Sequence, residues 1–329
     1  MITKIPHILK AISGVKVLCL GDLMLDRYIH GQATRLSPEA PVPIVLVRRH
    51  TYSPGGLGNV ALNLASLGVK PSIVGLVGDD QAANTLEGIL GKVIEPCSRP
   101  LICDPDRPTT IKTRVMAGIQ QVVRFDEESE KPLGSEPASR YQQTVLSLLK
   151  EVKAVAVSDY GKGVVTSDFC HWLLEAAQKL DLPVVIDPKG DDYGRYQGAA
   201  LVTPNRQELA LAVGRNIAGA KPEVLISEGF GLMARHKLKN LLITRSEEGM
   251  TLLSPPDVVK NLPTRAKEVY DVTGAGDTVV AVMAAALAAG LSLAEGAELA
   301  TAAAGVVVGK LGTAAATPEE ILSSIKANP

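Results

Sequence analysis

The stretch YDVTGAGDTVVAVMAAALAAG, residues 270–290, begins an alanine-rich helix with two glycines that flank an alanine. Inside a helix, glycine costs about 1 kcal/mol relative to alanine. With Thr273 as the expected N-cap, the amides of residues 274–277 are predicted to be unpaired donors that a phosphate can approach closely. Asp277 lies in the same turn and could accept a proton from an attacking hydroxyl group. An ordinary glycine-softened helix cap is the alternative interpretation.

On either side of this stretch, apolar strand-like runs alternate with helical segments, which indicates a parallel sheet covered by helices on both faces. The strand-like runs are 15–21, 71–78, 154–158, 183–187, 200–204 and 240–244, and the helical segments lie near 56–68, 80–92, 138–150, 167–180 and 205–213. Residues 41–52 and 109–128 instead alternate between polar and apolar side chains. We expect these two regions to form a small β-sheet that acts as a lid over the carboxyl ends of the main strands, where ligands bind in such folds.

Composition and charge exclude several classes of protein. The 329 residues are 46% hydrophobic and 21% charged, as in globular proteins, and the net charge of −1 gives no reason to expect nucleic acid or an anionic membrane as partner. The four cysteines and five histidines lack metal-ligand spacing, so no zinc site is expected and a reducing cytoplasm fits. The N-terminus lacks a signal-peptide pattern, and the apolar run 279–294 is shorter than the ~20 residues that span a bilayer.

Two stretches carry residues suited to binding sugar hydroxyls. SPGGLGNVALNLASLG (53–68) places Gly55 and Gly56 before a helix whose first turn carries Asn59. GDLMLDRY (21–28) follows the first strand with Asp22 and Asp26, and a carboxylate can accept hydrogen bonds from two adjacent hydroxyls. The alternatives are a common glycine turn and a solvated loop acid.

The segment TPNRQE (203–208) follows another strand and places Asn205 and Glu208 three residues apart. On one face of a first helical turn, their oxygens could hold a hydrated Mg²⁺ near phosphate groups. An ordinary helix start is the alternative.

Basic residues occur where a phosphorylated substrate could be bound. Lys112, Arg114 and Arg124 lie in the predicted lid, and Lys162 lies in SDYGKG after a strand. Arginines alternating on a flap above a pocket could hold a phosphate through charge-assisted hydrogen bonds. Solvated surface charges are the alternative.

Taken together and in this order, these stretches resemble the ribokinase-like (PfkB) family of carbohydrate kinases over essentially the whole chain. GGLGN resembles the N-terminal signature of the family and DVTGAGD its C-terminal signature. The resemblance implies an α/β three-layer sandwich with a mostly parallel central sheet and a small β-sheet lid. Residues 1–329 would form a single kinase domain, with lid strands inserted at about 34–52 and 99–126.

The resemblance also implies roles for individual residues. Asp277 would be the catalytic base, kept ionised by the helix N-terminus, and Gly274, Ala275 and Gly276 would form an anion hole. The sugar phosphate would be bound by Asp26, Gly55, Gly56, Asn59, Lys112, Arg114, Arg124 and Lys162. The nucleotide would lie near Asn205, Arg206, Gln207, Glu208, Thr244, Arg245 and Gly249, with Asn205 and Glu208 holding Mg²⁺ through water and Asp271 and Thr273 beside a monovalent cation such as K⁺.

Within the family, GDLMLDRY, SPEAPVPIV (37–45), DYGKG, IDPKG (186–190) and GKLGTA most resemble kinases of D-glycero-β-D-manno-heptose 7-phosphate. This implies ATP-dependent phosphorylation of the anomeric O1 hydroxyl to heptose 1,7-bisphosphate, on the route to ADP-heptose and the lipopolysaccharide core. Some relatives carry a nucleotidyltransferase domain after the kinase. Because this chain ends at Pro329, that second activity is expected to be absent.

The expected partners are ATP, the sugar phosphate and a second copy of the chain. The strand PVPIVLV (41–47) is apolar on both faces and would be an exposed edge in a monomer, which favours a cytoplasmic homodimer formed through the lids. Three other functions stay open: a kinase of another sugar, sugar phosphate or nucleoside, a binding protein without catalysis, and a nicotinamide dehydrogenase. The last is disfavoured because a GxGxxG motif would need glycine where Val279 stands.

Overall fold

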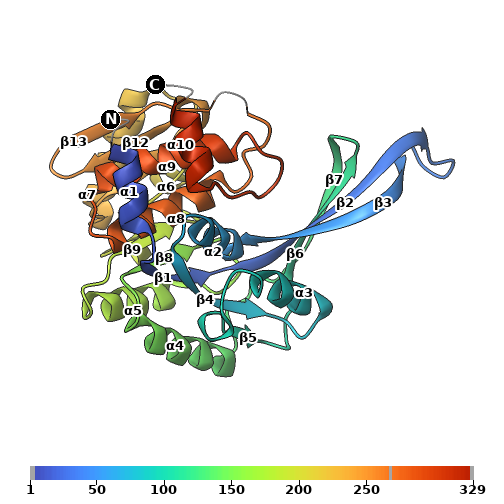
Figure 1. Cartoon of the computed structure of the whole chain (residues 1–329), viewed down its shortest axis with the longest axis horizontal. Helices are drawn as coiled ribbons and strands as arrows, with labels where there is room; N and C mark the ends of the chain where they lie inside the picture. The colour runs from blue at the N-terminus through green and yellow to red at the C-terminus, as the bar shows by residue number, and fades with distance from the viewer. Residues whose placement is uncertain (1–3, 267–268, 327–329) are drawn as a thin grey trace.

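The computed structural model describes residues 4–266 and 269–326, and its body is a nine-stranded sheet between two layers of helices (Figure 1). The strand order is β13-β12-β11-β10-β9-β8-β1-β4-β5. All neighbours from β11 to β5 pair in parallel, whereas β12 and β13 run antiparallel at one edge. The predicted three-layer fold with a mostly parallel central sheet is confirmed.

The strands of this sheet lie close to the predicted apolar runs, because each run supplies side chains that are buried on both faces. They are β1 (Lys16–Gly21), β4 (Lys70–Val77), β5 (Leu101–Cys103), β8 (Ala154–Ser158), β9 (Val184–Asp187), β10 (Leu201–Val202), β11 (Leu241–Thr244), β12 (Met250–Ser254) and β13 (Val258–Leu262). The run 200–204 gives only a two-residue strand, since Pro204 has no amide to donate and Asn205 already caps the next helix.

Two hydrophobic clusters lie on opposite faces of the sheet. The first cluster involves α1 (Ile5–Ile12), α2 (Leu57–Ser66), α3 (Gln81–Leu90), α8 (Ala275–Ala288), α9 (Leu293–Val307) and α10 (Pro318–Lys326). The second involves α4 (Ser135–Leu149), α5 (Ser167–Gln178), α6 (Arg206–Val213), α7 (Pro222–His236) and the short helix η3 (Tyr193–Tyr196). Two further short helices are η2 (Pro96–Ser98) and η4 (Ser246–Glu248). Within the described ranges, no helix is both long and apolar enough to cross a membrane.

Helix α8 is buried on all sides from Asp277 to Ala286, which explains its alanine-rich sequence. Small side chains allow α2, α9 and the sheet to approach its backbone closely. A Cβ added to Gly296 of α9 would lie 2.9 Å from Ala286 Cβ, so the two helices touch at these positions. Helix α8 is therefore packed closely against α9 near its C-terminal end.

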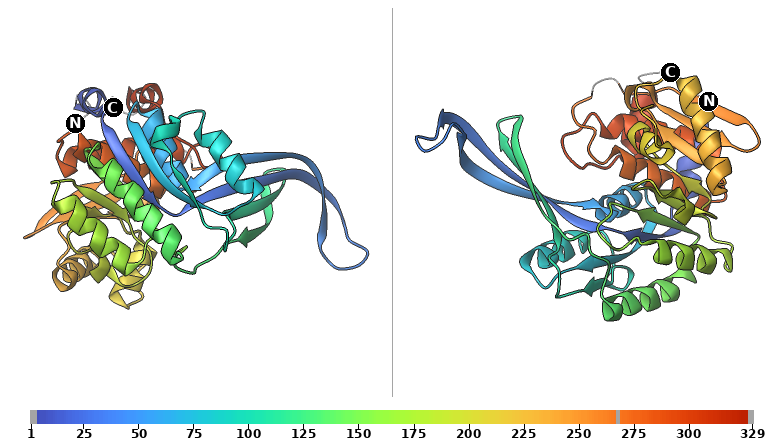
Figure 2. Two further views of the ribbon diagram at one scale, coloured as in Figure 1. Left: turned by 90° about the horizontal axis from the view of Figure 1, so that it is seen from below. Right: turned by 180° about the vertical axis from the view of Figure 1, so that it is seen from behind.

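A second sheet of four strands projects from the body as a long arm (Figure 2). Its order is β3 (Pro43–Gly56), β2 (Leu23–Leu36), β6 (Thr110–Ala117) and β7 (Gln120–Glu127). The predicted segments 41–52 and 109–128 form β3 and the β6–β7 hairpin. The alternative interpretation of Asp26 as a solvated loop acid is wrong, because Asp26 is buried in β2. The first residues of β2 are mostly apolar and buried and its later ones are mostly polar and exposed, so no single periodicity marks this strand.

The arm has one charged face and one face that is mainly apolar but also carries the Arg27–Glu127 ion pair, because side chains alternate along a strand. Asp26 of β2 lies opposite Lys112 of β6. Two residues further along β6, Arg114 lies opposite Arg124 of β7. On the opposite face, Thr113 of β6 lies between Phe125 of β7 and Arg27 of β2. Phe125 and Val123 on that face are 45% and 48% exposed.

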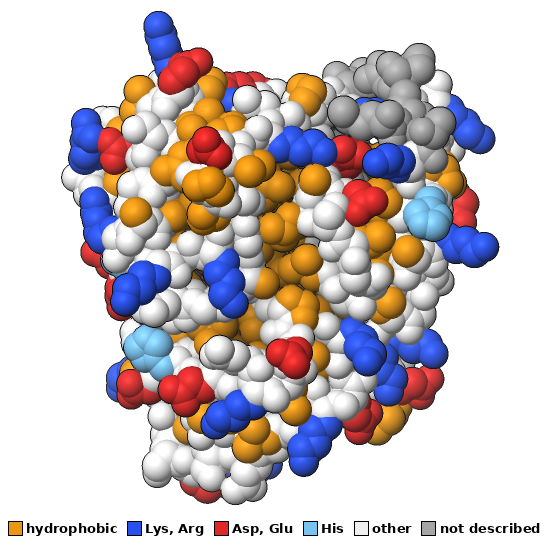
Figure 3. Space-filling model, turned by 90° about the vertical axis from the view of Figure 1, so that its left-hand side faces the viewer, with side chains coloured by type: hydrophobic (Ala, Val, Ile, Leu, Met, Phe, Trp, Pro, Cys, Tyr) orange, Lys and Arg blue, Asp and Glu red, His pale blue; other side chains and the backbone are white. Residues whose placement is uncertain are grey.

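A further apolar surface lies on the body, on the side that holds α7 and β13, where orange side chains gather near the middle of the view (Figure 3). Exposed apolar residues of these two elements are Val224, Val258 and Val259. Apolar side chains are therefore exposed on the arm and on this side of the body, and also elsewhere, as at Leu146 of α4 and Leu211 of α6.

Candidate active site

The carboxyl ends of the parallel strands converge on one cavity of about 480 Å³. Asp159 follows β8, Asp187 ends β9 and Thr244 ends β11, and all three line this cavity. The start of α8 closes it with Gly276. Open α/β folds bind their ligands at this edge, so the cavity is the candidate active site.

Asp277 is a buried carboxylate held by two donors from different parts of the chain. Asn59 Nδ2 donates to its Oδ2 at 2.8 Å, and Tyr160 Oη donates to its Oδ1 at 3.2 Å. Burial raises the pKa of Asp277 to about 7. We expected the helix N-terminus to keep this carboxylate fully ionised, but its burial outweighs that effect. A pKa near neutrality suits a general base.

The helix start differs from the expected cap. Gly274, and not Thr273, is the N-cap of α8, with φ of 80°, and no side chain caps the helix. The Ala275 amide, expected to be unpaired, donates to Val272 O at 3.2 Å. For the amides of Gly276 and Asp277, no hydrogen-bond partner lies among the described residues. The donors available to an anion are therefore fewer than expected and lie deeper in the first turn.

The predicted sugar-binding residues are brought together where the arm joins the body. Asp26 is buried and forms an ion pair with Arg114, and burial raises its pKa. A Cβ on Gly55 would lie 2.5 Å from Asp26 Oδ2, and one on Gly56 would lie 2.6 Å from Asp22 O. Both glycines are thus needed for close packing against Asp26 of β2 and against Asp22, which lies between β1 and β2. Asp22 is used inside the protein, since its oxygens accept hydrogen bonds from three backbone amides.

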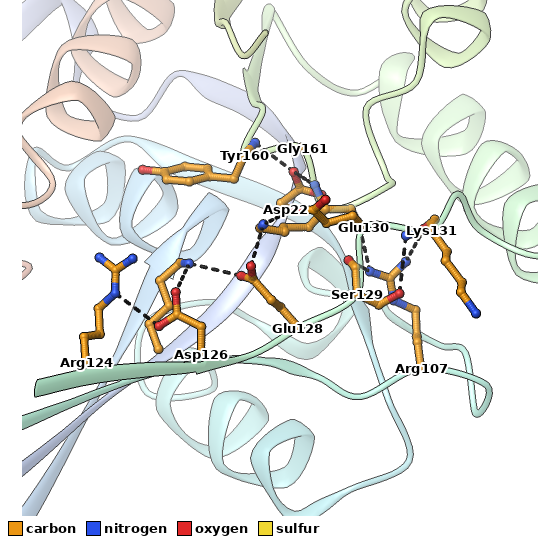
Figure 4. A network of polar contacts seen from close by, with 12 residues as sticks. Asp22, Arg107, Arg124, Asp126, Glu128, Ser129, Glu130, Lys131, Tyr160 and Gly161 are labelled. Atoms are coloured by element: carbon orange, nitrogen blue, oxygen red, sulfur yellow. Dashed lines mark hydrogen bonds and ion pairs between the residues drawn. The ribbon is translucent and has the colours of Figure 1, made fainter. Parts of the chain in front are cut away.

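Three of the four predicted phosphate-binding cations form one network with carboxylates (Figure 4), whereas Arg114 pairs with Asp26. Lys112 Nζ lies 3.1 Å from Asp126 and 3.2 Å from Glu128, and Lys162 Nζ lies 2.7 Å from Glu128. Arg124 Nε lies 3.1 Å from Asp126. The network joins β6 and β7 of the arm to the loop after β8. These cations already have anionic partners, which a phosphate would have to replace or share.

Asn205 and Glu208 form the capping box of α6, which was the alternative interpretation of this segment. Asn205 Oδ1 accepts from the amides of Gln207 and Glu208, and Glu208 Oε2 accepts from the Asn205 amide at 2.9 Å. Both side chains also line the cavity. Asn205 and Glu208 therefore cap α6 and line the cavity at the same time.

The acidic side chains at this end of the cavity are suited to a hydrated divalent cation. Burial raises the pKa of Asp187, and the charges of Glu208 and Asp277 raise it further. A divalent cation would relieve this repulsion. Within the described ranges, no three His, Cys, Asp or Glu side chains lie close enough to form a metal cage. The residues thus fit Mg²⁺ held mainly through water and phosphate oxygens.

Some of the predicted nucleotide-side residues line the cavity and others do not. Thr244 and Gly249 line it, whereas Arg206, Gln207 and Arg245 are not among its lining residues. Arg206 and Arg245 both pair with Glu248 instead. The cavity is also lined by apolar side chains, which offer a surface for a flat base: Val269, Val272, Val279, Ala304 and Val308.

Asp271 and Thr273 lie in the loop before α8. Asp271 accepts hydrogen bonds from the amides of Thr273 at 2.9 Å and Gly312 at 3.0 Å. These contacts help to hold the pKa of Asp271 below its usual value. The loop after α9, which contains Gly312, reaches the arm, since Ser53 Oγ lies 2.7 Å from Thr313 Oγ1. Asp271 is therefore held in its ionised form in the loop before α8.

Comparison with known families decides the class of protein. Residues 15–320 match the family described as pfkB family carbohydrate kinase. The chain belongs to the pfkB family of carbohydrate kinases. It is accordingly an ATP-dependent sugar kinase, and kinases of this family use ATP with a divalent metal.

Relatives of this PfkB kinase include longer proteins. It is 48% identical over 312 residues to the bifunctional protein HldE of Pectobacterium atrosepticum, covering 94% of this chain and 63% of that protein. It is 43% identical over 314 residues to HldE of Paramagnetospirillum magneticum, covering 95% of this chain and again 63% of the relative. The chain thus spans somewhat less than two thirds of the length of these relatives.

Solved structures share the fold of this PfkB kinase at low sequence identity. Phosphofructokinase-2 from Escherichia coli in complex with potassium superposes with a TM-score of 0.74 at 18% identity, covering 96% of this chain and 99% of that one. Arabidopsis thaliana ribokinase complexed with ribose and ATP gives a TM-score of 0.73 at 19% identity, covering 95% and 99%. The ribokinase-like fold is thereby confirmed.

Three residues at the site of this PfkB kinase were missed by reasoning from the sequence. Tyr160 contacts Asp277, and Asp187 and Lys189 line the cavity. Their common signal is position, because Tyr160 comes two residues after β8, Asp187 ends β9, and Lys189 follows two residues later. Attention to the first polar residues after each apolar run would have found them.

Proposed function

We propose that this kinase transfers the γ-phosphoryl group of ATP to the anomeric O1 hydroxyl of D-glycero-β-D-manno-heptose 7-phosphate, giving heptose 1,7-bisphosphate for ADP-heptose and lipopolysaccharide core biosynthesis. Sequence stretches typical of heptose-phosphate kinases and the identity to HldE support this acceptor. Residues 1–329 would act as one kinase domain in the cytoplasm. The arm of β2, β3, β6 and β7 would be its lid.

The single observation that carries the proposal is the position of Asp277. It lies at the start of α8, between the cavity lined by Gly276 and the buried carboxylate of Asp26, whose charge acts on it. A sugar held by Asp26 and Asn59 would place its reacting hydroxyl beside Asp277. The carboxylate would then orient that hydroxyl and accept its proton late in the transfer.

The remaining work of the site is to bind and neutralise phosphate groups. The amides at the start of α8 would donate to the transferring group. Among the described residues that line the cavity, Lys189 is the one basic side chain, so we assign it to the nucleotide phosphates. Mg²⁺ near Asn205 and Glu208 would supply charge neutralisation, and K⁺ is proposed beside Asp271 and Thr273. The lid would exclude water, which otherwise competes as the acceptor.

A panel of acceptors tests the proposed substrate. Release of ADP is measured with heptose 7-phosphate, fructose 6-phosphate, an unphosphorylated sugar and a nucleoside, each with ATP and Mg²⁺. The proposal predicts the highest kcat/KM for the heptose phosphate. A higher value for any other acceptor contradicts it, and no ADP release with any of them contradicts catalysis itself.

The lid arginines give a prediction about binding of the sugar phosphate. Arg114 is needed to pair the buried Asp26, so Arg124, whose side chain is 49% exposed, is the cleaner probe. Loss of its charge-assisted contact to the 7-phosphate should raise the KM for the sugar phosphate roughly 10-fold or more, while the KM for ATP stays unchanged. Steady-state kinetics of Arg124→Ala measure both constants.

The matched control is Arg140→Ala, which removes a surface arginine of α4 with a 52% exposed side chain that pairs with Glu136. It should leave both constants unchanged. If Arg124→Ala behaves like this control, Arg124 is a surface charge and does not contact the substrate.

We also propose that the chain forms a homodimer through the apolar face of the arm. Phe125 and Val123 lie on the face opposite Asp26 and Lys112, so their burial in a dimer would leave the charged face at the active site. An arm with such a face exposed in a monomer would be prone to aggregate.

Sedimentation velocity at micromolar concentration should therefore show a dimer, and Phe125→Glu should convert it into a monomer. Val258→Glu, which places the same charge on an exposed apolar residue of the body, should leave the dimer intact. A wild-type monomer, or dissociation caused by Val258→Glu alone, would contradict assembly through the arm.

A further inference from the structure

We propose that Tyr160 and Asp22 are positioning residues for Asp277: Tyr160 holds one oxygen of the carboxylate, and Asp22 holds the segments that carry both of its donors. The inference rests on the proposed role of Asp277 as the base. In this role the two residues act through Asp277 and need not contact the substrate.

The two donors fix the orientation of the Asp277 carboxylate. Asn59 occupies Oδ2 and Tyr160 occupies Oδ1, so the carboxylate cannot rotate without breaking a hydrogen bond. Burial raises the pKa of the Tyr160 hydroxyl well above its usual value, and the charges of Asp277 and Asp187 add to this. Tyr160 therefore stays protonated, and remains a donor, throughout the working pH range.

Asp22 holds the loop that carries Tyr160. Its Oδ2 accepts from the amides of Tyr160 at 2.8 Å and Lys162 at 3.0 Å, and its Oδ1 accepts from the Val164 amide at 3.4 Å. Asp22 is 2% exposed, so these contacts are shielded from water. A carboxylate is suited to this position because it can accept several hydrogen bonds and donates none when ionised.

The backbone of Asp22 connects to the second donor. Its carbonyl oxygen accepts from the Leu57 amide at 3.1 Å, and its own amide donates to Ser158 O at 3.0 Å. Leu57 is the first residue of α2, which carries Asn59. One residue thus ties together the end of β8, the start of α2 and the loop with Tyr160.

The same loop is attached to the base of the arm (Figure 4). Arg107 donates to the carbonyl oxygens of Ser129 at 2.9 Å, Lys131 at 3.2 Å and Lys162 at 2.6 Å. The Lys162 side chain pairs with Glu128, which follows β7. The loop is therefore held from the body by Asp22 and from the arm by Arg107 and Glu128.

Removal of the Tyr160 hydroxyl should change how activity depends on pH. The charged groups that face Asp277 are the carboxylates of Asp26 from β2 and Asp187 from β9, and both disfavour its ionisation. Tyr160 acts against them by donating to the ionised form. Without it, the pKa of Asp277 should rise, so the acid limb of the kcat/KM profile should move to higher pH.

The experiment compares Tyr160→Phe with the wild type between pH 5.5 and about 9.5, a range around the pKa of about 7. We expect activity at pH 7 to fall about 10-fold, the midpoint of the acid limb to rise by about one pH unit, and part of the loss to be recovered at pH 9. Asp22→Asn should move the midpoint in the same direction. A uniform loss at every pH would indicate a structural role only and would overturn the inference.

Tyr193→Phe is the matched control. Its hydroxyl is also buried, but within the described part of the chain it has no hydrogen-bond partner. The profile of this variant should coincide with that of the wild type. A shift in this control equal to that of Tyr160→Phe would mean that the contact with Asp277 is not the cause, and would also overturn the inference.

A second measurement does not depend on activity. The pKa of the buried Asp277 is raised to about 7 in the folded protein. The protein therefore becomes less stable as the pH rises from the pKa of this residue in the unfolded chain to its pKa in the folded protein. The difference in unfolding free energy between Asp277→Asn and the wild type should therefore grow with pH and level off near pH 7. When the same substitution is made in the Tyr160→Phe protein, this difference in unfolding free energy should level off at a higher pH.

The two readouts separate failure of the inference from failure of the proposed function. If the stability difference caused by Asp277→Asn levels off at the same pH with and without Tyr160→Phe, the role of Tyr160 is overturned, whatever the enzyme phosphorylates. If that pH rises while the wild type phosphorylates no acceptor, the contact is supported and the proposed function is wrong.

Discussion

Asp277→Asn is expected to lower turnover by roughly 10²–10⁴-fold, because asparagine keeps the shape of the side chain and cannot accept the proton. Binding of ATP should survive, since Asp277 contacts Asn59 and Tyr160 and does not line the cavity. Turnover follows from ADP release, and ATP binding from calorimetry. The variant should be at least as stable as the wild type above pH 7, where the buried carboxylate of the wild type is charged.

Asp168→Asn is the matched control for this substitution. Asp168 also lies in the first turn of a helix, α5, but its side chain is exposed. It should retain full turnover. Near-normal turnover of Asp277→Asn would mean that the start of α8 is an ordinary helix cap, and the proposed mechanism would lose its base.

Alanine at the two glycines of the same turn should have opposite effects on stability. Gly276 has no positive φ, and a Cβ there would meet Asp187 Oδ2 at 3.7 Å, an ordinary contact. Gly276→Ala should therefore keep or raise stability by up to about 1 kcal/mol. Turnover should fall by up to about 10²-fold, because the methyl group would lie where the phosphate approaches the amides.

Gly274→Ala should instead destabilise the protein. Gly274 has φ of 80°, and its added Cβ would clash with Asn59 Nδ2, the donor to Asp277. Thermal melts and turnover of both variants test this contrast. If Gly276→Ala retains full turnover, the amides of this turn do not meet the transferring phosphate.

Much of the fold could be predicted because the signal for a buried parallel strand is local. The run 154–158 became β8 with the same bounds, and 183–187 became β9 with one residue fewer. The β12–β13 hairpin was missed because β13 is mostly exposed and its side chains show no continuous apolar run. Strand β2 was missed because its burial changes halfway along its length.

The site could be predicted only in part, because its residues come together through the sheet. Asn59 and Asp277 were found in short motifs, and their hydrogen bond joins residues far apart in the chain. The pairing of Lys112 with Asp126 could not be predicted, since it depends on the register of β6 and β7. The pairing of Lys162 with Glu128 depends on how the arm meets the loop after β8. The position of Tyr160 two residues after β8 was a usable signal, but its contact with Asp277 depends on the folded chain.

Identification of the product tests the central claim most directly. The protein is incubated with ATP, Mg²⁺ and D-glycero-β-D-manno-heptose 7-phosphate, and the mixture is analysed by phosphorus NMR. We predict that ADP forms together with a sugar that keeps its 7-phosphate and gains a phosphorus signal coupled to the anomeric proton. ADP without a new sugar phosphate signal, or a new phosphate on any other carbon, would contradict the proposed reaction.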